Sequence, residues 1–278
     1  MVIIEEAMQS DHTFDSQKLK ERFNPEGSML RRQQHKMLEM VKELDRICRK
    51  HHIPYFLYGG TLLGAIRHKG FIPWDDDLDV GLMRKDYQRL MEVLPQELPE
   101  HIALQNNDTD PNYFYFFAKL RDRHSLLEEE SPYDRVFKER GIFIDIFPFD
   151  HQRMWTHLLG EPLQGHTFKI FRTAKNLSWA MRKIRFITWV NRHITFPILR
   201  GISRITAGKT LTYDYGIPFH IVFDEKDIFP LSTHEFEGVQ LSVPGNSHQM
   251  LQTQFGDYMQ LPNLDHLQSH TSKLEIYD

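Results

Sequence analysis

The stretch YGGTLLGAIRHKGFIPWDDDLDVGLM, from Tyr58 to Met83, decides the fold. It carries a glycine pair, a basic triplet and four aspartates between two apolar runs. Apolar residues alternate with polar residues or glycine from Leu78 to Leu82, which predicts a strand with one face against a core. The glycine pair followed by Thr61 is typical of a tight turn between a strand and a helix. We therefore expect a strand, a turn, a short helix over 62–68 and a second strand, in that order.

Asp77 and Asp79 are two residues apart on the second strand, so their side chains project from the same face. Two carboxylates held side by side repel each other unless a cation lies between them, and hard oxygen ligands suit Mg²⁺ or Mn²⁺. Asp145, in the apolar run GIFIDIFPFD, is costly to bury without a charged partner. We predict that Asp77, Asp79 and Asp145 are catalytic residues and metal ligands. The alternatives are a solvated acidic turn and, for Asp145, a structural salt bridge.

The residues around the acidic group are candidates for binding a phosphorylated substrate. Gly59 and Gly60 let the backbone approach a ligand closely, and Thr61 is predicted to cap the following helix, whose N-terminal amides favour a phosphate. The other candidate substrate-binding residues are Arg67, His68, Lys69, Trp74, Asp75, Lys119 and Arg121. The alternatives are a solvated helix end for the basic triplet and core packing for Trp74.

The composition is that of an ordinary globular protein, with 278 residues of which 40% are hydrophobic and 26% charged. Cys48 is the only cysteine, which excludes an internal disulfide framework and a zinc site built on cysteines. The sequence shows no signal peptide and no apolar run long enough to span a membrane. We therefore expect a cytoplasmic protein.

The basic residues are unevenly distributed. Of the 34 Lys and Arg residues, ten lie between Pro162 and Tyr213, where there is no Asp or Glu, which leaves 24 against 38 acidic residues elsewhere. Aromatic residues interleave with these cations, namely Phe168, Phe171, Trp179, Phe186, Trp189 and Phe196. This pattern predicts peripheral contact of residues 166–209 with an anionic membrane surface. The alternative is a helical subdomain whose basic face is solvated or lines the donor channel. No motif supports nucleic-acid binding, and we expect none.

The remaining periodicities predict an α+β fold with a mixed β-sheet and flanking helices. The expected helices cover 28–51, 84–94, most of 166–206 and 248–255, and the other expected strands cover 53–58, 114–120 and 142–147. We divide the chain into an N-terminal segment (1–27), a catalytic core (28–160), an inserted basic helical section (161–213) and a C-terminal segment that completes the core (214–278).

The motif GGTLLGAIRHKGFIPWDDDLDV resembles the signature of the LicD family, the phosphorylcholine transferases that also resemble the fukutin-related proteins. Three later blocks resemble those of the family in the same order: KLRDR at 119–123, FIDIFPFD at 143–150, and the segment 227–262. The resemblance implies a nucleotidyltransferase-like core. It also implies that Asp77 and Asp79 form an Asp-x-Asp metal site, with Asp145 as the third carboxylate.

The resemblance further implies an activity. The family transfers a phosphoalcohol, with choline phosphate as the best-known case, from a CDP-activated donor to a sugar hydroxyl of a cell-surface glycan or its lipid-linked precursor, releasing CMP. One alternative is transfer of a nucleoside monophosphate to a small hydroxylated acceptor with release of pyrophosphate. Another is a non-enzymatic scaffold on a transferase fold, against which the intact carboxylate set argues. Action on a lipid-linked acceptor would suit a peripheral location at the inner membrane surface.

Overall fold

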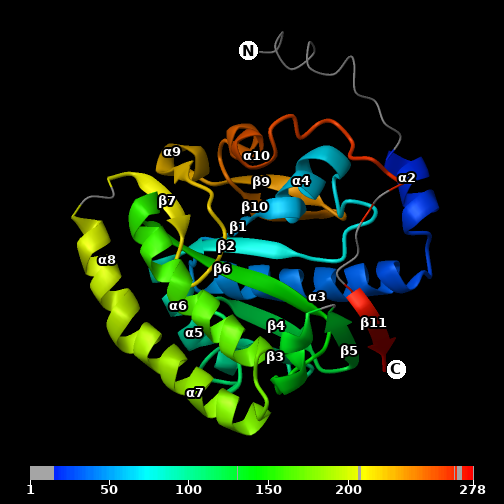
Figure 1. The fold of residues 1–278 in the computed structure, drawn as a ribbon. Coiled ribbons are helices and arrows are strands. Elements are labelled where there is room, and N and C mark those ends of the chain that lie inside the picture. The colour runs from blue at the N-terminus through cyan, green and yellow to red at the C-terminus, as the bar shows by residue number, and fades with distance from the viewer. Residues whose placement is uncertain (1–15, 130, 206–207, 266, 268–270, 278) are drawn as a thin grey trace.

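The computed structural model describes residues 16–129, 131–205, 208–265, 267 and 271–277 (Figure 1). It has the mixed α+β architecture predicted from the sequence. The central sheet has the order β1-β2-β6-β4-β3, and β7 continues it by pairing with the end of β6 and with β8. Only β2 and β6 run parallel; the other neighbouring pairs are antiparallel. The bounds are β1 (Phe56–Leu57), β2 (Asp79–Met83), β3 (Ile102–Gln105), β4 (Ala118–Asp122), β6 (Phe143–His151), β7 (Thr210–Tyr213) and β8 (Phe223–Asp224).

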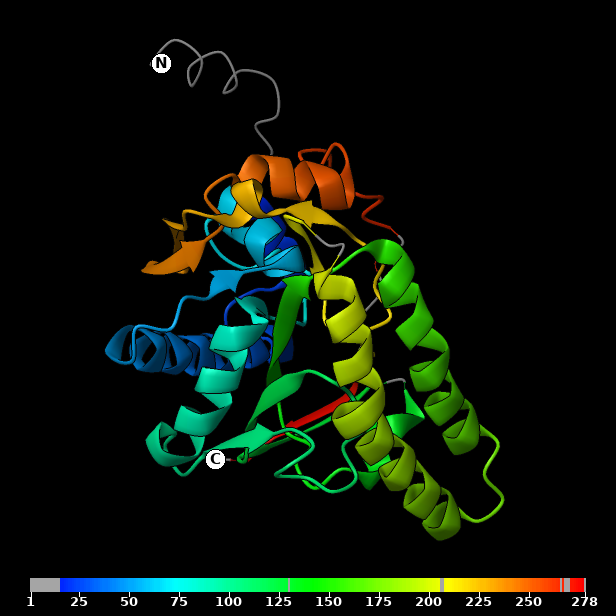
Figure 2. The same ribbon diagram turned by 90° about the vertical axis from the view of Figure 1, so that its left-hand side faces the viewer.

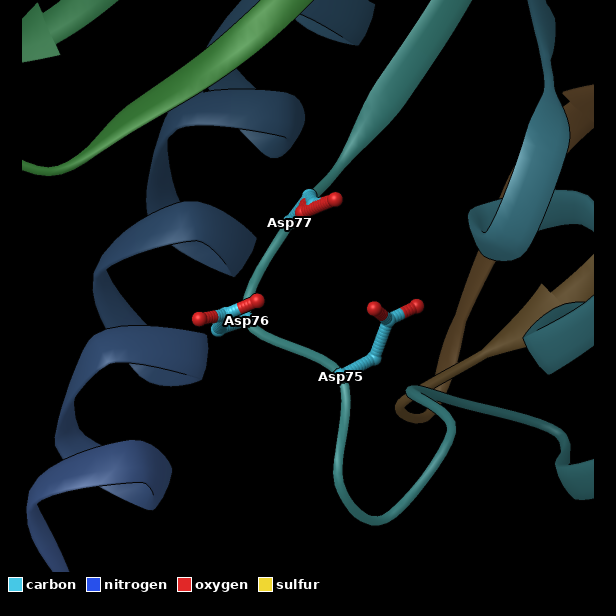
Figure 3. A group of neighbouring side chains, drawn as sticks. All are labelled: Asp75, Asp76 and Asp77. Atoms are coloured by element: carbon cyan, nitrogen blue, oxygen red, sulfur yellow. The ribbon is translucent and has the colours of Figure 1, made fainter. Parts of the chain in front are cut away.

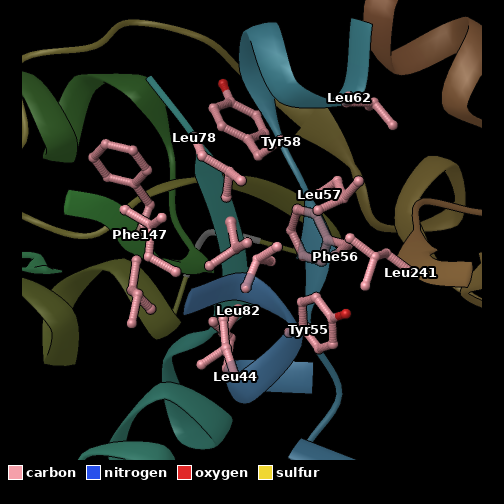
Figure 4. Packing of buried hydrophobic residues seen from close by; sticks show 14 of the residues in the cluster. Leu44, Tyr55, Phe56, Leu57, Tyr58, Leu62, Leu78, Leu82, Phe147 and Leu241 are labelled. Carbon is pink, nitrogen blue, oxygen red and sulfur yellow. The ribbon is translucent and has the colours of Figure 1, made fainter. Parts of the chain in front are cut away.

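The long helix α3 (Met29–Lys50) supports this sheet from one side, and Figure 1 shows it crossing beneath the strands. Ser28 is its N-cap, as predicted, because its side chain accepts a hydrogen bond from the backbone N–H of Arg31. The apolar face of α3 is buried, and Leu44 lies among the side chains of β1 and β2 (Figure 4). Two further helices flank the strands: α4 (Gly59–His68) and α5 (Arg84–Glu97).

The C-terminal part adds two small sheets. A hairpin of β9 (Ser232–Phe236) and β10 (Val239–Val243) packs near α4 together with α9 (Glu225–Ile228) and α10 (Ser247–Phe255) (Figure 1). The last strand, β11 (Thr271–Ile276), pairs antiparallel with β5 (Ser125–Glu129). A short 3₁₀ helix, η1 (Pro132–Val136), follows β5, and α2 (Ser16–Phe23) precedes α3.

The basic section forms a helical hairpin at the edge of the molecule (Figures 1 and 2). Its first arm is α6 (Met154–Arg172), and its second arm is a continuous rod of α7 (Leu177–Val190), the π turn η2 (Asn191–Thr195) and α8 (Phe196–Arg204). Pro197 does not interrupt this rod, because it lies in the first turn of α8, where its missing N–H costs little. Within the described ranges, no helix combines the length and the apolar character needed to cross a bilayer.

Several predicted boundaries are corrected by the structure. The helix expected over 62–68 begins at Gly59, and the helix expected to end before Pro95 continues to Glu97. Of the strand expected over 114–120, only the second half belongs to the sheet, as part of β4. The strand expected over 142–147 is longer than predicted, because β6 runs on to His151. The helical stretch expected from 166 begins at Met154, and residues 1–15 of the predicted N-terminal segment lie outside the described residues.

Candidate active site

Strand register brings three of the predicted site residues into one row. Asp79 on β2 is the direct neighbour of Asp145 on β6, and Asp145 is in turn the direct neighbour of Lys119 on β4. Directly opposed residues on adjacent strands place their side chains on the same face, with Cβ atoms about 5 Å apart. Two carboxylates and an ammonium group therefore lie side by side across three strands.

The loop before β2 adds three more carboxylates. One oxygen from each of Asp75, Asp76 and Asp77 lies within 4.8 Å of the others, and they form the only such acidic group of three among the described residues. Figure 3 shows Asp76 on the side of the loop that faces α3, and Asp75 on the opposite side. The Asp76 carboxylate accepts a hydrogen bond of 3.0 Å from the backbone N–H of Thr271, so the C-terminal strand holds it in place.

The N-terminus of α4 is directed against these acids. A Cβ atom on Gly59 would lie 2.9 Å from Oδ2 of Asp79, and one on Gly60 would lie 2.7 Å from Oδ2 of Asp75. Gly59 also has a φ of +59°, which favours glycine. The absence of side chains thus lets the positive end of the helix dipole approach two carboxylates closely.

The predicted cap by Thr61 is wrong. Tyr58 occupies the N-cap position without a side-chain hydrogen bond, and Thr61 lies in the first turn of α4. The hydroxyl oxygen of Thr61 instead accepts a hydrogen bond of 2.8 Å from the backbone N–H of Asp79. Thr61 therefore positions the first residue of β2 relative to α4.

The electrostatics of the acidic group favour a cation. Burial, followed by the charges of Asp77 and Asp145, raises the pKa of Asp79 well above its usual value. Burial, followed by Asp77 and Asp76, does the same to the pKa of Asp75. Repulsion of this kind is relieved by a bound divalent ion, and carboxylate oxygens are the ligands that Mg²⁺ and Mn²⁺ take. The residues present therefore fit a divalent metal.

Lys119 partly balances the charge of Asp145. Its ammonium nitrogen lies 2.8 Å from Oδ1 and 3.2 Å from Oδ2 of Asp145, and only the contact to Oδ2 has the geometry of a hydrogen bond. Burial raises the pKa of Asp145, while Lys119 lowers it without cancelling the effect of burial. The same ammonium lies 3.3 Å from the ring centroid of Phe143, a cation–π contact.

Arg67 and His68, two of the predicted basic residues, lie in the last turn of α4 and have partners within the protein. Arg67 donates hydrogen bonds to the backbone oxygens of Tyr258 (2.7 Å) and Gln260 (3.2 Å), so it ties the C-terminal segment to α4. Burial, followed by Arg67 and Lys20, lowers the pKa of His68 to about 3. At neutral pH His68 is uncharged, which does not favour its predicted role in clamping phosphate.

Three other predicted residues have structural surroundings. Lys69 is exposed at the C-cap of α4 in a left-handed conformation. Trp74 is half-buried and packs edge-on against Phe23 at 5.4 Å between ring centroids, in agreement with the core-packing alternative. Arg121 is fully buried, and its guanidinium donates to Gln105 and to the backbone oxygen of Gly141. Contact of these residues with substrate stays a prediction.

The acidic residues open onto a small cavity of about 70 Å³. Its lining adds Glu129 and Thr271, which the sequence reasoning missed, to Asp76, Asp77 and Asp145. Both lie on the paired strands β5 and β11, and no spacing in the sequence indicated that the last strand reaches the site. A larger cavity, of about 490 Å³, is lined by Arg84, which follows β2, and by Pro148, Arg192 and Asp214 among others.

Comparison with known proteins assigns this arrangement to a family. A family model described as "LicD/FKTN/FKRP, nucleotidyltransferase domain" matches residues 52–170, which include α4 and the aspartates of β2 and β6. The protein named lipopolysaccharide cholinephosphotransferase LicD from Haemophilus influenzae is 30% identical over 256 residues, which cover 84% of this chain and 92% of that protein. The chain belongs to the LicD family.

Two animal proteins are similar to a short segment of the chain. The mouse and human proteins named ribitol 5-phosphate transferase FKRP are each 53% identical over 34 residues, which cover 12% of this chain and 7% of the relative. The family resemblance read from the GGTLLGAIRHKGFIPWDDDLDV motif is thus confirmed.

Proposed function

We propose that this LicD-family chain transfers a phosphoalcohol, phosphocholine by preference, from a CDP-activated donor to a sugar hydroxyl of a cell-surface glycan or its lipid-linked precursor, releasing CMP. The observation that carries the proposal is the match to a cholinephosphotransferase over 92% of that relative's length. The carboxylates across β2 and β6 support the proposal. A pyrophosphate donor needs a positive charge beside it, and these acids are suited to hold the cation that would supply that charge.

We further propose that Asp77, Asp79 and Asp145 hold Mg²⁺ or Mn²⁺. Asp77 belongs both to this set and to the close group of Asp75–Asp77, while Asp76 is already engaged by the backbone of Thr271. When bound, the metal neutralises the donor pyrophosphate and the leaving CMP. Asp75, beside Gly60, orients the loop against the N-terminus of α4.

The chain's own groups would then position the reactants. The backbone amides of Gly59 and Gly60, at the positive end of α4, would receive a donor phosphate. Lys119 would hold the Asp145 carboxylate in place, and Asp145 would take the proton of the acceptor hydroxyl as it attacks phosphorus. This arrangement of helix N-terminus and strand-borne acids is also the reason to propose a nucleotidyltransferase-like core.

The proposal is tested by identifying the products. We expect CMP when the protein is supplied with Mg²⁺, a glycan acceptor and CDP-choline, with CDP-ribitol and CDP-glycerol as comparison donors. Asp79→Asn should lower the rate at least about a hundredfold, as removal of transition-state charge stabilisation does elsewhere. Asp86→Asn, in the first turn of α5, where Asp86 pairs with Arg89, is the matched control and should be unaffected. Release of pyrophosphate from CTP in place of CMP from a CDP-alcohol would overturn the proposal and support nucleotidyl transfer.

A further inference from the structure

The outer rod of the helical hairpin exposes a continuous apolar stripe. On α7 the exposed side chains include Trp179, Phe186 and Trp189, and Phe186 is 66% exposed. The π turn and α8 continue the series with Ile194, Ile198 and Ile202. Large apolar side chains gathered in this way on a solvent-exposed surface mark an interaction site.

The spacing of these residues places them on one side of the rod. Trp179 and Phe186 are seven residues apart, and the three isoleucines are four apart, which are the spacings of a single helix face. Because a π turn contains more residues than an α turn, the five-residue step from Trp189 to Ile194 keeps the series on that face. The opposite face is buried and includes Ile184, Thr188, Phe196 and Ser203.

The stripe is accompanied by cations that form no ion pair with an acid of the described residues. Of the ten basic residues between 162 and 213, Arg192 pairs with Asp108 and Arg200 with Asp214, while the other eight form no ion pair with a described residue. Arg182 and Lys183 belong to the same turns as the exposed aromatics, and the Lys183 ammonium lies 3.5 Å from the ring centroid of Trp179. Lys169, Arg172 and Lys175 surround the connection between the two arms.

The first arm extends the apolar surface at its other end. Trp155, Leu158 and Leu159, in the first turns of α6, are exposed. The start of α6 lies beside the end of α8, where the hydroxyl oxygens of Thr156 and Ser203 are 3.1 Å apart. Exposed apolar residues of both arms therefore occur at this end of the hairpin, and Lys169, Arg172 and Lys175 lie at the other.

We propose that the outer face of this hairpin lies on the surface of an anionic phospholipid bilayer, with the apolar stripe at the level of the acyl-chain boundary and the cations at the headgroups. A helix that is apolar on one face and basic beside it binds in the plane of such an interface. A second copy of the same face fits less well, because it would bring two sets of unpaired cations together. The proposal does not depend on the reaction that the active site performs.

The test is flotation of the full-length protein with vesicles. Vesicles of phosphatidylglycerol and phosphatidylethanolamine should bind the protein at low salt, with binding that weakens as salt rises, and vesicles of phosphatidylcholine should bind it poorly. Three of the four tryptophans (Trp155, Trp179 and Trp189) are exposed on the hairpin, so the fluorescence should shift to the blue on binding.

Matched variants identify the surface. A triple variant of the stripe, with Phe186→Ser, Ile198→Ser and Ile202→Ser, should bind the vesicles at least tenfold more weakly. A double variant of the cations, with Lys175→Glu and Arg182→Glu, should show the same loss. Phe255→Ser and Lys85→Glu, exposed on α10 and α5, should bind like the wild-type protein. With CDP-choline and a soluble acceptor, all four variants should release CMP at the wild-type rate, which separates this test from that of the reaction. Absence of binding to anionic vesicles, unaltered binding by the stripe variants, or a wild-type dimer that the stripe variant converts to monomer would overturn the proposal.

Discussion

Two hydrogen atoms, the side chains of Gly59 and Gly60, decide how closely α4 approaches the carboxylates of Asp79 and Asp75. A Cβ on either residue would enter the space of a carboxylate oxygen. The cost of packing acids this tightly is visible in the raised pKa values of Asp75 and Asp79, for which burial and the neighbouring carboxylates are responsible. Such crowding is typical of a site built for a charged ligand rather than for stability.

Gly60→Ala tests this close approach. Its new Cβ would lie 2.7 Å from Oδ2 of Asp75, so the carboxylate must move, and a displacement on the order of 1 Å at a reacting centre can cost about a hundredfold in rate. We expect a folded protein with at least about tenfold slower CMP release. Gly165→Ala, on α6 with no atom within 4 Å of the new Cβ, is the control and should keep full activity. Equal rates for both variants would contradict this account of the glycine pair.

His68 provides a prediction about pH. Its pKa is lowered to about 3 in the folded protein by burial and then by Arg67 and Lys20, whereas an unfolded histidine titrates near ~6.5. The unfolded chain therefore binds the extra proton in this interval, and the folded state loses stability as pH falls from about 6.5, by at most about 1.4 kcal/mol per pH unit for this group. Urea titrations of His68→Gln should show a smaller loss between pH 6.5 and 4.5. The exposed His166→Gln should behave like the wild-type protein, and an unchanged slope for His68→Gln would refute the assignment.

At the scale of elements, register rather than sequence spacing assembles the site. The periodicities predicted α3, α10 and the start of β2, because these segments have a regular apolar pattern of sufficient length. They did not predict β3, β5 or the strands from β7 to β11, which are short and take their conformation from their partners in the sheet. That Asp79, Asp145 and Lys119 share one row follows from strand pairing, which no local pattern encodes.

A buried charge cluster joins the helical hairpin to the sheet. Asp214, directly after β7, accepts from Arg200 of α8 at 2.7 and 2.9 Å and from Arg84 of α5 at 3.0 Å. Burial alone would raise the pKa of Asp214, but Arg200 and then Arg84 lower it overall. One carboxylate therefore holds the end of β7 to α8 and to α5, which is distant in the sequence.

Asp214→Asn should destabilise the protein by about 3 kcal/mol, because two partly buried guanidinium groups lose their buried counter-charge. Asp108→Asn is the matched control: Asp108 pairs with Arg192 of the same hairpin, but its side chain is 63% exposed, so the loss should be at most about 1 kcal/mol. Chemical denaturation followed by circular dichroism measures both values. An equal loss of stability in the two variants would show that the Asp214 cluster does not hold the hairpin to the sheet.

At the scale of the whole molecule, the site combines residues 59–79 with the strands β4, β5 and β6 and with the last strand, β11. The acidic loop was readable from the sequence because four aspartates beside a glycine pair are rare in an ordinary turn. Glu129 and the backbone of Thr271 were not readable, since their place beside Asp76 depends on the pairing of β11 with β5. The uneven charge, by contrast, was visible in composition alone, and the structure shows where the unpaired cations lie on the hairpin.

The central claim is that the acids at the start of β2 hold a divalent cation, and calorimetric titration of the metal-free protein with Mn²⁺ tests it most directly. We expect saturable binding by the wild-type protein and by Asp86→Asn, and affinity at least about tenfold weaker in Asp79→Asn, which removes one predicted ligand while relieving repulsion in the metal-free state. Without metal, Asp79→Asn should unfold at a temperature no lower than that of the wild-type protein. Its weaker binding of Mn²⁺ would then not result from a loss of folding. Mn²⁺ binding by Asp79→Asn with wild-type affinity, or no binding by the wild-type protein, would contradict the account.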